Sequence, residues 1–147
     1  MPKRSYGDTA CQNTCLFLQQ LLRVVNSESA VPPEVDINYR WRDEDARRPK
    51  LVVQASLADL LSICRHEAND GMSKSTLRDS LHALEHFLGI LEDNRISTQG
   101  ATIWHFTLEL WSHDTDFNLA QVLKLWQHKQ ERSSASSGPP PTGVDRR

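Results

Sequence analysis

The segment from Leu88 to Trp111, LGILEDNRISTQGATIWHFTLELW, restricts the possible folds more than any other part of this 147-residue chain. It starts at the end of a helical pattern, where Gly89 can adopt the positive φ that often closes a helix. A β-rich run, Ile90–Arg95, comes next and is followed by the polar sequence ISTQGA. Residues 102–111 then alternate between apolar and polar side chains, which is typical of a half-buried strand. The segment therefore predicts a helix followed by a β-hairpin.

Four segments have the spacing of amphipathic helices, in which apolar residues recur at positions i, i+3, i+4 and i+7. The first is predicted from Thr9 to Asn26 and ends before the proline pair of SESAVPP. We expect two capping boxes, because Thr9 is followed by Gln12 and Ser56 by Asp59. The other two helix starts are marked by Ser73 or Ser75 and by Asp114 or Asp116. The expected buried faces are Leu18, Leu21, Leu22 and Val25; Leu57, Leu60, Leu61 and Cys64; Leu77, Leu81, Leu84 and Leu88; and Leu119, Val122, Leu123 and Trp126.

Two further β-rich runs lie between the first and second helices. Residues Val35–Trp41 alternate between apolar and polar side chains, and the short run KLVVQA begins at Lys50. A hairpin across the charged loop RDEDARRP is the economical way to join them. The complete order is then α-β-β-α-α-β-β-α. Without the extra strand and the last helix, this is the order of a winged helix, a helix-turn-helix variant with a β-hairpin wing. We therefore predict a winged-helix-like α+β fold with a small antiparallel sheet.

The composition fits one folded domain with polar ends, since 24% of the residues are charged and 38% are apolar. We expect residues 1–8 to be a flexible N-terminus, residues 9–131 to form the domain, and the Ser/Pro-rich residues 132–147 to be a disordered tail. No apolar run approaches the ~20 residues needed to cross a bilayer, and no secretory signal follows the basic N-terminus. The three cysteines are an odd and sparse set, which suits reduced thiols in a cytoplasmic protein.

The winged-helix-like order makes DNA binding the first function to consider, with the third helix as the recognition helix. Its outward positions include Arg78, but Asp79 and Glu85 share that surface and would repel phosphate. The hairpin offers Arg95, yet Glu92 stands close before it. The formal net charge of −2 also lacks the basic bias of a dedicated nucleic-acid binder. A small DNA-binding transcriptional regulator therefore remains the alternative function.

The sequence contains no strong signal for catalysis or for a cofactor. G-x-S-x-G, Walker-type and G-x-G-x-x-G loops do not occur in it. His82 and His86 have the i, i+4 spacing that lets two imidazoles reach one metal ion, but solvated histidines on an exposed face are the stronger interpretation. Cys64 lies on an apolar helical face, where a thiol behaves as an inert hydrophobe. We therefore expect no enzymatic activity, no cofactor and no metal site.

The aromatic residues of the predicted strands fall mostly on one sheet face, toward the helices. Trp111 is different, because it falls on the opposite face of its strand from Trp104. An outward tryptophan near a strand end suits a role as a partner anchor, since Trp is enriched at binding hot spots. Packing of Trp111 under the last helix, beside Trp126, is an equally good interpretation.

Three stretches of this sequence, EVDINYRW, RPKLVVQA and ILEDNRISTQGATIWHFTLELW, resemble a small α+β domain of large bacterial, especially cyanobacterial, signalling proteins. Such effector-associated or adaptor-type domains stand beside STAND-type NTPase modules (NACHT or NB-ARC) and repeat arrays. The resemblance covers about Glu34–Trp126 and assigns no functional residues. It implies a signalling role, with a STAND NTPase or an associated effector as the partner.

Together, these observations predict a non-enzymatic adaptor domain that binds a protein partner. The surfaces expected to bind are the third helix and the closing hairpin. Their candidate contact residues are Arg78, His82, His86, Arg95 and Trp111.

Overall fold

The computed structural model describes residues 6–27, 34–43, 48–65, 72–94, 96–98 and 101–137. Its elements in chain order are α1 (Asp8–Asn26), β1 (Ile37–Arg42), β2 (Lys50–Ser56), α2 (Leu57–Arg65), α3 (Lys74–His82), the π-helical turn η2 (Ala83–Phe87), β3 (Leu91–Asp93), β4 (Ile96–Thr98), β5 (Ala101–Glu109) and α4 (Thr115–Ser137). Since η2 continues α3 and β4 continues β3, the order is the predicted α-β-β-α-α-β-β-α. The α+β fold is thus confirmed, while the comparison with a winged helix stays a prediction.

The strands form one antiparallel sheet in the order β1-β2-β5-β3, and β4 also pairs with β5. Asp93 of β3 opposes Phe106, and Ile96 of β4 opposes Ile103, so both short strands share one register on β5. The sequence ISTQGA, predicted as a loop, therefore contributes strand residues at 96–98 and 101. The β-branched residues Ile96 and Thr98 explain this difference, because such side chains favour the extended conformation.

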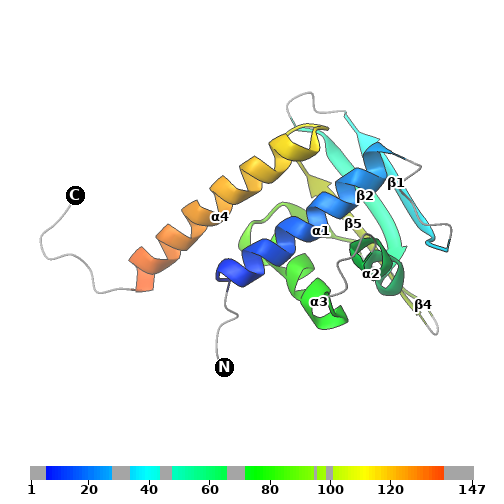
Figure 1. Ribbon diagram of the computed structural model, residues 1–147, viewed down its shortest axis with the longest axis horizontal. Helices are drawn as coiled ribbons and strands as arrows, with labels where there is room; N and C mark the ends of the chain where they lie inside the picture. Colours follow the sequence, from blue (N-terminus) through cyan, green and yellow to red (C-terminus); the bar gives the residue numbers. More distant parts are fainter. Residues whose placement is uncertain are drawn as a thin grey trace, which may run out of the picture.

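Helices α1 and α2 lie over the same face of the sheet (Figure 1). The main core forms there, where Phe17 and Leu21 of α1 meet Val53 of β2 and Phe106 of β5, all fully buried. β2 alternates in burial as a strand with one covered face does, because Leu51, Val53 and Ala55 are buried and Gln54 is exposed. The opposite face of the sheet carries mostly polar side chains, among them Arg42, Lys50 and Glu109, which oppose one another on successive strands.

The helix starts follow the capping rules at three of the four predicted positions. At α2, the Ser56 hydroxyl lies 2.8 Å from Asp59 Oδ2 and accepts the Asp59 N–H at 3.1 Å. The side chains of Ser73 and Asp114 accept backbone N–H groups at the starts of α3 and α4. The box predicted at Thr9 is wrong, because α1 starts at Asp8 with Gly7 as an N-cap that has no side chain to accept a bond.

The buried helix faces largely agree with the predicted spacing, with one clear exception on α4. Asn118, Val122 and Trp126 of this helix are buried, whereas Leu123 is 44% exposed. Successive helical residues are ~100° apart, so a helix that directs Val122 inward turns Leu123 toward the rim of the core. The prediction that Leu123 belongs to the core is therefore wrong.

The C-terminal helix is longer than the sequence pattern indicated. We predict a disordered tail from residue 132, but α4 continues to Ser137. A helix that is already anchored by packing extends at little cost, since each further residue adds a hydrogen bond without a new nucleation step.

Gly89 has a φ of +71°, as expected for a glycine that closes a helix. A Cβ atom built at Gly89 would meet nothing within 4 Å, so the cost of a side chain there comes from the backbone rather than from a clash. We expect Gly89→Val to lower the free energy of unfolding by about 1 kcal/mol or more. Urea denaturation measures this, with Gly89→Asn as the control because asparagine tolerates positive φ. Equal stability of Gly89→Val and wild type would contradict the conformation of this junction.

Candidate functional site

The predicted contact residues of the third helix lie on its outward side. The Ser73 cap fixes the start of α3, and Leu77 and Leu81 then point into the core. This leaves Arg78 exposed and His82 half-buried, and the exposed His86 follows in η2. We name these three residues the α3 face. The charge around this face is mixed, because the carboxylate of Asp79 is also exposed on α3.

The structure brings His82 and His86 together, with ring centroids 4.2 Å apart. His82 Nδ1 lies 2.9 Å from the hydroxyl of Tyr6, and His86 Nε2 lies 3.3 Å from a carboxylate oxygen of Glu85. Within the described residues, no group of three or more His, Cys, Asp or Glu side chains could hold a metal ion. His82 thus contacts the N-terminal segment, whereas His86 contacts its neighbour Glu85.

Tyr6 packs against two helices, although it lies within residues 1–8, which we expect from the sequence to be a flexible N-terminus. The Tyr6 ring stacks on Phe87 of η2 at 4.6 Å and meets Trp126 of α4 edge-on at 6.3 Å. Its carbonyl oxygen accepts hydrogen bonds from Trp126 Nε1 at 3.2 Å and from Gln130 Nε2 at 2.9 Å. Tyr6 therefore joins the α3 face to α4, although it lies 76 residues from His82 and 124 residues from Gln130 in the sequence.

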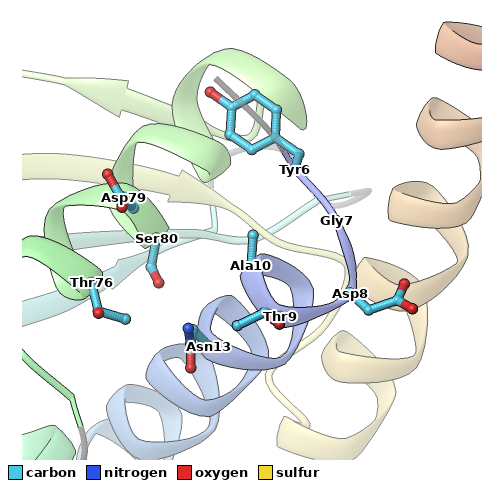
Figure 2. Close-up of a pocket in the computed structure, with 9 residues that line it drawn as sticks. All are labelled: Tyr6, Gly7, Asp8, Thr9, Ala10, Asn13, Thr76, Asp79 and Ser80. Atoms are coloured by element: carbon cyan, nitrogen blue, oxygen red, sulfur yellow. The ribbon is translucent and has the colours of Figure 1, made fainter. Parts of the chain in front are cut away.

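A cavity of about 420 Å³ lies beside the α3 face, between the start of α1 and helix α3. Figure 2 shows Ser80 and Thr76 of α3 on one side of it and Ala10 and Asn13 of α1 on the other, while Asp8 points away toward α4. Its remaining lining residues are Tyr6, Gly7, Thr9 and Asp79. The Ser80 hydroxyl is buried and has no hydrogen-bond partner among the described residues. The cavity is lined by both polar and apolar surface, and the Ser80 hydroxyl offers a hydrogen bond to a side chain placed in it.

Trp111 does not join the α3 face. It lies just before α4, whose start is far from α3 in Figure 1, and its backbone N–H donates to Asn118 Oδ1 at 3.0 Å. The Arg48 guanidinium lies 4.6 Å from the ring centroid, and it also donates to the carbonyl oxygens of Leu110 and Glu109. Trp111 is half-buried against the core, so its ring is partly covered from within the domain. Arg95, the remaining predicted contact residue, lies outside the described residues.

The three cysteines are free thiols, and Cys64 is fully buried in α2. Burial raises the pKa of the Cys64 thiol from 9.0 to about 12. Burial, helped by the neighbouring Cys11, likewise raises the pKa of Cys15 to about 12, and burial also raises that of Cys11. Since the thiolate is the reactive form, these side chains are poor nucleophiles at neutral pH.

The raised pKa of Cys64 predicts how its contribution to stability depends on pH. Below pH 9 the Cys64 thiol keeps its proton in both the folded and the unfolded chain, so Cys64 makes its full contribution to the free energy of unfolding. Between pH 9 and 12 the unfolded chain releases a proton that the folded chain retains, and the contribution falls. We therefore expect the stability difference between wild type and Cys64→Ala to shrink as pH rises through this range. Urea denaturation at several pH values tests this, and a constant difference would contradict it.

The family model for effector-associated domain 4 matches residues 7–128. Because the match covers most of the chain, this protein belongs to the effector-associated domain 4 family. No curated protein and no solved structure shows a significant match. Within the described residues, none of the helices is long and apolar enough to cross a membrane.

Proposed function

We propose that this domain is a non-enzymatic signalling adaptor that binds a protein partner through the α3 face. Membership of the effector-associated domain 4 family is the observation that carries the proposal. The family match supports a domain of signalling or adaptor type. The choice of surface rests on the geometry of α3.

The α3 face has the properties of a protein-binding surface rather than a phosphate-binding one. It combines an exposed guanidinium at Arg78 with two imidazoles, and a cavity of about 420 Å³, lined by both polar and apolar surface, opens beside it. A partner could place an acidic side chain on Arg78 and a hydrogen-bonding side chain in the cavity. Such mixed chemistry resembles the rim and pocket arrangement of protein interfaces.

The alternative of a DNA-binding regulator has less support. The exposed Asp79 lies directly beside Arg78 in the chain, and the half-buried Glu85 lies beside His86 in η2. On the hairpin, Glu92 of β3 is also exposed. Each carboxylate would meet the phosphate backbone of a duplex laid along α3, and the repulsion would offset the gain from Arg78.

A STAND NTPase, or an effector protein that works with one, is the first partner to test. The resemblance of this sequence to domains beside such modules suggests this choice. Trp111 and Arg95 remain proposed secondary contact residues on the hairpin side, and we propose that the protein works in the cytoplasm.

Affinity capture from the native host tests the proposal. The bait is wild type, Arg78→Glu, or Lys124→Glu, a matched charge reversal at an exposed position of α4. We expect Arg78→Glu to lose at least about tenfold in recovery of a partner that the other two baits retain, because one attractive contact becomes repulsive. Equal recovery by all three baits would contradict a role for the α3 face.

A further inference from the structure

Strand β1 ends the sheet that the described residues form, and among these residues only one of its two edges is paired. Its six residues pair with β2 in an unbroken antiparallel register from Ile37 opposite Ala55 to Arg42 opposite Lys50. No other described strand lies along its outer edge. An edge of this kind presents backbone N–H and C=O groups to any extended chain that comes alongside.

The outer face of the sheet is cationic at this edge. Arg40 and Arg42 of β1 point to the face opposite the core, and Lys50 lies directly across from Arg42. Like charges placed opposite each other on neighbouring strands destabilise a sheet. On the side of Lys50 away from β1, Glu109 of β5 lies opposite Lys50. The Glu109 carboxylate, however, pairs with Arg48 at 3.7 Å. Within the described residues, neither Arg40 nor Lys50 has an ion pair through its side chain.

The inner face of β1 is apolar and incompletely covered. Ile37, Tyr39 and Trp41 alternate with the polar residues and are each only half-buried against the core. Trp41 also stacks on His113, with ring centroids 4.2 Å apart. A further strand beside β1 would cover the exposed parts of these side chains, as successive strands do within the sheet.

We propose that the outer edge of β1 binds an extended segment of a partner protein in which acidic and apolar residues alternate. The segment adds as a strand by backbone hydrogen bonds. Its carboxylates lie beside Arg40 and Lys50 on the outer face, and its apolar side chains lie beside Tyr39 and Trp41 on the inner face. The partner class rests on the proposed function, whereas the surface is separate from the α3 face.

The charges on the outer face also disfavour two other ligands at the β1 edge, namely a second copy of this chain and duplex DNA. Pairing β1 with β1 of a second copy would bring the same guanidinium groups together, which is unfavourable. Duplex DNA is wider than the cationic strip, because neighbouring strands are only ~4.8 Å apart. Glu109 and Glu92 on the following strands of the same face would then meet the phosphates.

Fluorescence anisotropy with labelled peptides tests the proposal. The main probe is a six-residue peptide of alternating valine and glutamate, as long as β1, and a second probe carries lysine in place of glutamate. Two more probes are N-methylated, one on every valine and the other on every glutamate. In an added strand, every second N–H group points toward β1, so these groups belong either to all the valines or to all the glutamates. Methylation of the N–H groups that point toward β1 should abolish binding, whereas methylation of the others should not. The lysine probe should not bind.

Variants of the intact chain complete the test. We expect Arg40→Glu/Lys50→Glu to weaken binding of the valine-glutamate probe by at least about tenfold, since two attractive cross-strand pairs become repulsive. Lys124→Glu and Arg78→Glu should bind it like wild type, and circular dichroism checks that each variant is folded. The proposal is overturned if the probe does not bind at millimolar concentration, if both N-methylated probes bind equally, or if only duplex DNA binds in a manner that depends on Arg40. None of these outcomes would affect the capture result for Arg78→Glu.

Discussion

Trp126→Ala is expected to lower the free energy of unfolding by about 3–5 kcal/mol, the range for removal of a large buried aromatic side chain. Trp126 is 1% exposed and meets Phe87 edge-on, with ring centroids 5.0 Å apart. Its indole N–H also donates to the Tyr6 carbonyl oxygen at 3.2 Å. Truncation therefore leaves a cavity beneath α4 and removes the group that holds Tyr6 against the domain.

Urea denaturation followed by circular dichroism measures this loss. Leu123→Ala is the matched control on the same helix, because its side chain is 44% exposed, and we expect a change within about 0.5 kcal/mol. If Trp126→Ala does not fold, Trp126→Phe keeps a ring in the site and should cost about 1–2 kcal/mol. A loss below about 1 kcal/mol for Trp126→Ala would contradict the packing of α4 described above.

Asn118→Ala is expected to cost about 2–4 kcal/mol, although it removes only a small side chain. The Asn118 Oδ1 atom accepts the backbone N–H groups of Trp111 at 3.0 Å and Ser112 at 3.1 Å. Its Nδ2 donates to the Ser112 carbonyl oxygen at 2.8 Å. Asn118 is fully buried, so the variant loses three hydrogen bonds in a place where water cannot easily replace them.

The control for this prediction is Asn94→Ala. Asn94 is exposed and makes one long side-chain hydrogen bond, 3.4 Å to the Thr107 hydroxyl, so its loss should change stability by less than about 0.5 kcal/mol. Thermal and urea unfolding of both variants provide the comparison. Equal effects of Asn118→Ala and Asn94→Ala would show that Asn118 does not hold the connection between β5 and α4.

Local patterns in the sequence were enough to predict much of this fold. The capping box at Ser56, the helix end at Gly89 and the alternation in β1 and β5 each depend on residues close in the chain. The errors arose where two local signals competed. Thr9 fits the capping pattern, but the backbone of Gly7 allows the helix to begin earlier. Leu123 fits the apolar spacing, but the burial of Val122 and Trp126 decides which side of α4 faces the core.

The candidate site was predictable only in part, for a related reason. Helical periodicity placed Arg78, His82 and His86 on the outward side of one helix without any knowledge of the rest of the fold. The partner of His82 could not be predicted, because Tyr6 lies 76 residues away in the sequence. The cavity beside α3 depends in the same way on how α1 and α3 pack, which no short motif encodes.

Site-specific photocrosslinking in the native host tests whether the α3 face contacts a protein partner. A photoreactive phenylalanine analogue replaces Arg78 in one version of the protein and Lys124 in another, both at exposed positions. We expect a discrete covalent adduct with another protein from position 78 and none from position 124. Crosslinks from position 78 only to DNA, or identical adducts from both positions, would contradict it.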